Sequence, residues 1–175
     1  MRLFDASISD SVFLFLKNDI KTWETAQFAN IKLCQACGIT NFFSNDTEIQ
    51  QIANELNGIN YSVVCEDRAE YGDFQTNQSL TQQITTQLKK EGINPQIVIE
   101  PTCGKGNFIL AVLKTFNNIE KIYGVEIQEK YIWEAKFNIL DFFLKNPKDM
   151  NFSLIGTYLG AKKSVYDIDF SKIEC

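Results

Sequence analysis

Residues 100–108 read EPTCGKGNF, and the predicted fold is organised around this stretch. A β-branched run, residues 97–99, leads into it, and an apolar segment, residues 109–113, leads out of it. That order is typical of a buried strand that turns directly into a helix. Gly104 and Gly106 lack a Cβ, so the backbone there can adopt positive φ and a ligand can approach it closely. The N–H groups that open such a helix form a natural anion site.

A second predicted strand, residues 122–126, ends at Glu126. This is about the spacing at which an acidic residue of a βαβ nucleotide-binding fold reaches the ribose hydroxyls. Two competing motifs fit less well. A dinucleotide fingerprint has a third glycine where Ile109 stands, and a P-loop has Ser or Thr where Gly106 stands. Glu100, at the end of the first strand, instead suits a ligand with an ammonium group, such as S-adenosylmethionine.

Residues 100–108 resemble motif I of the amino-methylating DNA methyltransferases, specifically the N6-adenine enzymes of restriction–modification systems. Residues 71–77, YGDFQTN, are similar to their motif X, and residues 124–127, GVEI, to their motif II. Motif X ahead of motif I is the order of the γ subgroup. The resemblance covers residues 61–145. It implies an α/β, Rossmann-like S-adenosylmethionine-dependent methyltransferase fold, present here in part.

The resemblance also implies S-adenosyl-L-methionine as the cofactor and assigns binding roles. Motif X would help to hold the methionine carboxylate, with Thr76 as hydroxyl donor. The alternative is that Thr76 caps the following helix, and one hydroxyl can contribute to both. Glu100 and the main chain of residues 102–106 would face the methionine portion, and Glu126 would accept from the ribose hydroxyls.

Ile127 would pack against the adenine, and Asp167 would meet its amino group, although another alignment puts Ser164 there. Phe108 would either cover the cofactor or face the core. The predicted cofactor-binding residues are Phe74, Thr76, Glu100, Pro101, Thr102, Gly104, Gly106, Phe108, Glu126, Ile127 and Asp167.

The family places an Asn/Asp-Pro-Pro-aromatic motif against the amine of an adenine flipped out of the duplex. The three prolines of this chain, at 95, 101 and 147, are never adjacent, so no catalytic residue is assigned. We expect the cofactor-binding part of a DNA adenine methyltransferase, a truncated enzyme that is inactive alone. The alternatives are a non-catalytic subunit that complements a separate catalytic and recognition chain, a methyltransferase acting on RNA, protein or a small molecule, and an unrelated nucleotide-binding protein.

Composition limits the partners. The net charge is −5, whereas a domain that holds DNA alone is expected to be basic; we therefore expect DNA to bind through segments missing here.

Histidine is absent, which excludes Ser-His and Cys-His catalysis. The lone Cys34-x-x-Cys37 is more typical of reduced thiols than of zinc, and Cys103 is not expected to be a nucleophile. The apolar run at residues 12–16 is too short for a signal or a membrane span, so we expect a cytoplasmic protein.

The remaining pattern predicts a mainly helical extension, residues 1–60, packed on a methyltransferase domain, residues 61–175. Strands separated by helices predict a parallel sheet. Leu80, Ile84 and Leu88 share one face of a predicted helix. The helices are expected at 11–16, 22–37, 46–56 (capped by Asp46 or Thr47), 79–90, 107–116 and 129–144. The strands are expected at 97–100, 122–126 and 152–155, and residues 61–65 form either a short strand or the approach to motif X.

Overall fold

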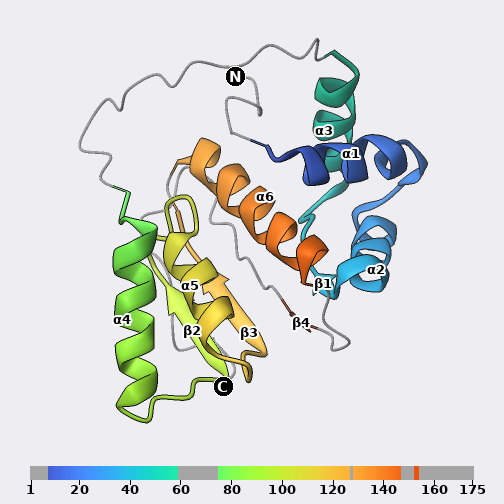
Figure 1. Cartoon of the computed structure of the whole chain (residues 1–175). Helices are drawn as coiled ribbons and strands as arrows, with labels where there is room; N and C mark the ends of the chain where they lie inside the picture. The colour runs from blue at the N-terminus through green and yellow to red at the C-terminus, as the bar shows by residue number, and fades with distance from the viewer. Residues whose placement is uncertain (1–7, 59–74, 127, 147–151, 154–175) are drawn as a thin grey trace.

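A computed structural model describes residues 8–58, 75–126, 128–146 and 152–153 (Figure 1). Within these residues, short parallel strands form one sheet in the order β1-β4-β3-β2. The strands are β1 Ile39–Thr40, β2 Ile97–Glu100, β3 Lys121–Gly124 and β4 Phe152–Ser153. The predicted strand at 97–100 is therefore confirmed, and its neighbour is β3, as expected. Residues 61–65, predicted as a short strand or the approach to motif X, lie outside the described residues.

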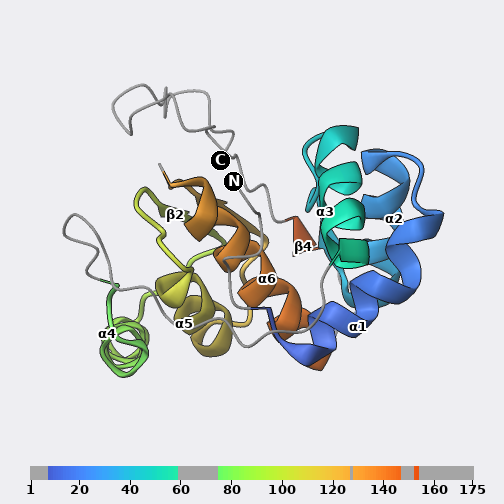
Figure 2. The same cartoon turned by 90° about the horizontal axis from the view of Figure 1, so that it is seen from above.

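Helices α5, Asn107–Thr115, and α6, Glu129–Lys145, connect the strands along the chain as predicted. In α6, residues 131–137 are all buried. A helix that is buried on every side has neighbours all round, and Figure 2 shows α6 between α5 and the N-terminal helices. The buried residues of α6 include Tyr131, Ala135, Phe137, Leu140 and Phe143, whereas Leu144 is half-buried.

The N-terminal region is mainly helical, as predicted, but its boundaries differ. Its helices are α1 Asp10–Asp19, the 3-10 turn η2 Ile20–Thr22, α2 Ala26–Cys37 and α3 Asp46–Gly58. The helix predicted from residue 22 starts later because Thr25 accepts a hydrogen bond from the N–H of Phe28 and caps it. Strand β1 was not predicted. It pairs with β4, so the N-terminal region contributes an edge strand to the sheet.

Asn45, rather than Asp46 or Thr47, caps α3. Its Oδ1 accepts from the N–H of Glu48 at 3.1 Å. Asp46 instead accepts from the N–H of Ala26 at 2.7 Å, at the start of α2. A side chain on one helix therefore satisfies an N–H group that α2 leaves unpaired at its own N-terminus.

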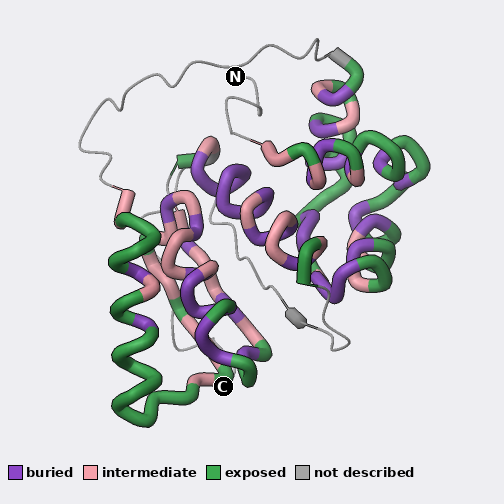
Figure 3. The backbone as a smooth tube through the Cα atoms, viewed as in Figure 1, coloured by how far each residue is buried: buried purple, intermediate pink, exposed green. Residues whose placement is uncertain are grey.

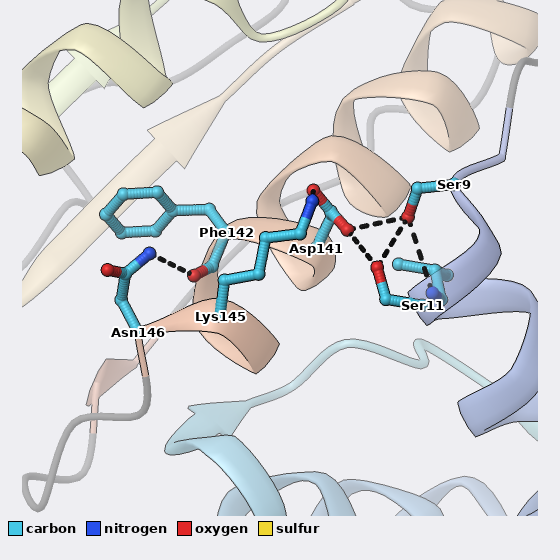
Figure 4. A network of polar contacts seen from close by, with 7 residues as sticks. Ser9, Ser11, Asp141, Phe142, Lys145 and Asn146 are labelled. Atoms are coloured by element: carbon cyan, nitrogen blue, oxygen red, sulfur yellow. Dashed lines mark hydrogen bonds and ion pairs between the residues drawn. The ribbon is translucent and has the colours of Figure 1, made fainter.

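Polar contacts join α1 to α6 (Figure 4). Ser9 donates to Oδ1 of Asp141 at 2.6 Å, and Ser11 donates to the same oxygen. Lys145, one turn further along α6, pairs with Oδ2 of Asp141 at 2.6 Å. A single buried hydrophobic cluster also includes residues of both the N-terminal helices and α6, so these helices pack on α6.

Helix α4, Gln78–Lys90, confirms the helix predicted at 79–90, but its apolar face points outward. Leu80, Ile84 and Leu88 are 49%, 37% and 43% exposed, respectively, and Figure 3 shows α4 as mostly exposed. The side that faces α5 is polar: Thr85 shares a 3.0 Å hydrogen bond with Thr115. None of the described helices combines the length and apolar character needed to cross a membrane.

Candidate functional site

The turn between β2 and α5 is built around two glycines in left-handed conformations. Gly104 has φ of 50° and Gly106, the N-cap of α5, has φ of 84°. The N–H of Gly106 donates to the carbonyl of Cys103 at 2.8 Å and closes the turn. Side chains with a Cβ rarely adopt such φ values, so the two glycines fix where the strand ends and the helix begins.

Helix α6 lies directly beside this turn. A Cβ on Gly106 would stand 3.3 Å from the Cβ of Ala135, closer than nine in ten real contacts of this kind. The ammonium group of Lys105 pairs with Oε1 of the buried Glu134 at 3.1 Å, and Asn138 donates to the Lys105 carbonyl at 3.0 Å. The side chain of Lys105 therefore anchors the turn to α6.

The pairing of β2 with β3 continues past both strands and brings Glu126 to the turn. The N–H of Val125 donates to the carbonyl of Glu100 at 2.9 Å, and the N–H of Cys103 donates to the carbonyl of Val125 at 2.8 Å. Oε2 of Glu126 then accepts from the N–H of Gly104 at 3.0 Å. The expectation that Glu126 closes β3 is wrong, because the strand ends at Gly124; the carboxylate nevertheless lies against the glycine turn, at the carboxyl ends of the parallel strands.

A third segment, residues 75–77, reaches the turn from α4. Oε1 of Gln75 accepts from the N–H of Lys105 at 3.0 Å. Nδ2 of Asn107 donates to the carbonyl of Thr76 at 2.8 Å. Asn77, not Thr76, caps α4 through its side chain. The interpretation of Thr76 as the cap is therefore wrong, while the role of its hydroxyl toward a cofactor stays a prediction.

Acidic groups give the turn a negative electrostatic environment. Burial raises the pKa of Glu100, and hydrogen bonds from the backbone and side chain of Thr102 oppose this shift. Burial, together with the charges of Glu126 and Glu100, raises the pKa of Cys103 to about 12. The Cys103 thiol is thus protonated at neutral pH and is a poor nucleophile, whereas a cation would be favoured beside these two carboxylates.

The described residues of the predicted site lie in or beside this one turn, and they differ in exposure. Pro101 and Phe108 are half-buried, Thr102 is exposed, and Gly104 and Gly106 are buried. Three predicted residues, Phe74, Ile127 and Asp167, lie outside the described residues, as does the alternative Ser164.

Sequence reasoning missed the polar side chains that hold the turn, namely Gln75, Lys105, Asn107, Glu134 and Asn138. The one signal available in the sequence was Asn107, a polar residue that follows Gly106 directly at the predicted start of the helix. Among the described residues, no group of three or more metal-ligating side chains comes together.

Comparison with known proteins gives one local similarity of note. A stretch of 69 residues, 39% of this chain, is 45% identical to the Type II methyltransferase M.NspV of Nostoc sp. (strain ATCC 29411 / PCC 7524). The chain spans only 14% of the length of that protein. No protein-family model matches the chain. The similarity supports a relationship to a Type II methyltransferase.

Proposed function

We propose that this chain is the cofactor-binding part of a site-specific DNA adenine N6-methyltransferase with a Rossmann-like fold, and that S-adenosyl-L-methionine binds at the turn between β2 and α5. The observation that carries the proposal is the contact between Glu126 and Gly104 at the carboxyl ends of parallel strands. Ligands of open parallel sheets bind at this edge. The similarity to M.NspV supports the same class of reaction.

The turn has features that fit this cofactor. Glu100 and Glu126 favour a ligand with positive charge on its sulfonium and ammonium groups. A carboxylate offers about four lone-pair positions. Glu126 uses one oxygen for Gly104 and the other for the N–H of Gln128 at 2.9 Å, so each oxygen can still accept from a ribose hydroxyl.

The other assignments are proposed from the resemblance to the methyltransferase motifs. Bound S-adenosylmethionine would supply an activated methyl group. Glu100 and the main chain of residues 102–106 would hold its methionine portion, with Thr76 donating to the methionine carboxylate. Ile127 and Asp167 would contact its adenine, and Phe74 and Phe108 its remaining surface. Because alignment of the cofactor and the nucleophile accounts for much of such catalysis, the role proposed for this chain is to fix the cofactor.

The target base is assigned to another part of the enzyme. This sequence has no Asn/Asp-Pro-Pro-aromatic motif, and its charge of −5 is unfavourable for holding DNA. We therefore propose that double-stranded DNA is held by segments beyond residues 1–175 or by a complementing chain. Residues 1–60 are proposed as a helical extension and residues 61–175 as the incomplete cofactor-binding domain.

The binding experiment uses S-adenosylhomocysteine and isothermal titration calorimetry. The chain is expected to bind this probe, and Glu126→Ala is expected to weaken binding by at least about tenfold, the effect of losing hydrogen bonds to a charged group. Glu91→Ala, at the exposed end of α4, is the matched control. A wild-type chain that binds neither S-adenosylhomocysteine nor S-adenosylmethionine would refute the proposal.

Glu126→Ala also removes the partner of the Gly104 N–H, so a second ligand separates the two effects. S-adenosylhomocysteine without its ribose hydroxyls should bind the wild-type chain more weakly than the full ligand does. In Glu126→Ala the two ligands should bind almost equally. An equal preference for the hydroxyls in both proteins would exclude the ribose contact.

The gene distinguishes the two arrangements of the enzyme. A reading frame that continues past codon 175 into Asn-Pro-Pro or Asp-Pro-Pro codons supports one polypeptide. A stop codon after Cys175, next to a gene that encodes this motif, supports a complementing chain.

A further inference from the structure

We infer that Gln75 is a positioning residue for the cofactor turn, whose side-chain amide holds Gly104 and Lys105 in the shape that receives the ligand. The inference rests on the proposed function and adds to it a residue outside the predicted site.

The contact joins two segments that are 30 residues apart. Oε1 of Gln75 accepts from the N–H of Lys105 at 3.0 Å. The same amide lies against Gly104, where a Cβ would overlap Oε1 and stand 3.1 Å from both Cδ and Nε2. Gly104 has a positive φ, and a side chain at this position would displace the Gln75 amide.

A second contact places Gln75 with respect to the turn. Asn107, the first residue of α5, donates to the carbonyl of Thr76 at 2.8 Å. The adjacent residues Gln75 and Thr76 thus contact the turn at Lys105 and at Asn107. Gln75 is therefore held on the turn by its own side chain and by the backbone carbonyl of the adjacent Thr76.

The turn is consequently held from two sides. Glu126 accepts from the N–H of Gly104, and Gln75 accepts from the next N–H, that of Lys105. One acceptor comes from the β3 side and the other from the α4 side. A binding loop that is already ordered loses less conformational entropy when its ligand binds. Loss of the Gln75 acceptor should therefore weaken ligand binding, although Gln75 itself does not contact the ligand.

The test compares Gln75→Met, which keeps the side-chain length but loses the acceptor, with Gln75→Glu, which keeps the acceptor. We expect Gln75→Met to bind S-adenosylhomocysteine about five- to tenfold more weakly, the effect of one hydrogen bond, and Gln75→Glu to recover most of the affinity. Gln83→Met, on the exposed face of α4, is the matched control. Hydrogen exchange of the Lys105 amide in the ligand-free chain should be faster in Gln75→Met than in wild type.

A double-mutant cycle tests the contact with Gly104 directly. Gly104→Ala should weaken binding more in the wild-type background than in Gln75→Ala, where the added methyl group has room. This cycle also serves if Gln75→Met fails to fold.

The possible results separate the two proposals. Wild-type binding together with unchanged affinity and Lys105 exchange in Gln75→Met would overturn the inference and leave the proposed function standing. Strictly additive losses in the cycle would also overturn it. A wild-type chain that does not bind S-adenosylhomocysteine would overturn the proposed function and this inference with it.

Discussion

The ammonium group of Lys136 on α6 lies 3.3 Å from Oε2 of Glu48 on α3, and both residues are buried. The same oxygen accepts from the N–H of Ser44 at 2.9 Å, and the ammonium group stands 4.4 Å from the ring centre of Trp133. Burial lowers the pKa of Lys136, and the charge of Glu48 opposes this shift. The pair therefore links the N-terminal helices to α6 through charges that depend on each other.

Removing one member of this pair should be costly. Glu48→Ala leaves a buried ammonium group without its carboxylate, and we expect it to lower the free energy of unfolding by about 3–5 kcal/mol. Urea denaturation followed by circular dichroism measures the loss, with the exposed Glu24→Ala as control. Replacing both members by apolar residues, Glu48→Leu with Lys136→Met, should cost far less. A loss under about 1 kcal/mol in Glu48→Ala would contradict the mutual dependence of the two charges.

Asp141 should make stability depend on pH in the acid range. Its partial burial raises its pKa, but hydrogen bonds from Lys145, Ser11 and Ser9 and the charge of Lys145 outweigh this and lower the pKa below 3.8. A lowered pKa in the folded state adds stability above the unfolded pKa, and this stability is lost as pH falls through the folded pKa.

Asp141→Asn is therefore expected to destabilise the chain by about 1 kcal/mol near neutral pH and to reduce the loss of stability on acidification below about pH 4. Thermal unfolding at a series of pH values measures both effects. Asp19→Asn, at the exposed end of α1, is the control. If wild type and Asp141→Asn lose stability in parallel below pH 4, the serine and lysine contacts do not stabilise the carboxylate.

The pKa of Glu100 is shifted in the opposite direction to that of Asp141. Its pKa is raised above 4.5 by burial, so the folded chain binds this proton more tightly than the unfolded chain does. Stability then falls as pH rises from about 4.5 through the folded pKa. At neutral pH the ionised carboxylate costs stability at the same position where it is proposed to attract the cofactor.

Glu100→Gln should consequently melt at a higher temperature than wild type at pH 7 and bind S-adenosylhomocysteine more weakly. Differential scanning calorimetry and titration calorimetry on the same samples measure the two effects, and the exposed Glu120→Gln serves as control. Lower stability of Glu100→Gln would mean that the hydrogen bonds from Thr102 outweigh burial.

The placement of the two glycines and of Glu126 at one turn has local signals in the sequence. Gly104 and Gly106 stand between a β-branched run and an apolar helix, and both adopt the positive φ that such a position favours. Glu126 follows the next strand closely, and the parallel pairing of β2 with β3 brings it to the turn. Strand pairing thus converts a spacing along the chain into a contact.

The missed parts depend on contacts between distant residues. Gln75 and Lys105 are 30 positions apart, and no pattern in either segment indicates that the amide meets that particular N–H. Strand β1 has only two residues and is too short for any periodicity. The buried Lys136 looks like a solvated charge in the sequence, because its partner is on another helix.

Two leucine substitutions test whether the outward apolar face of α4 is exposed in solution. Leu88 is 43% exposed and Leu140 is fully buried, so Leu140→Ala should cost about 2–5 kcal/mol. Leu88→Ala should change the free energy of unfolding by less than about 0.5 kcal/mol, since Ala is also the better helix former. Urea denaturation of both variants at two protein concentrations measures this. A cost for Leu88→Ala close to that for Leu140→Ala would show that this face of α4 is covered in solution; dependence of that cost on protein concentration would identify the cover as a second copy of the chain.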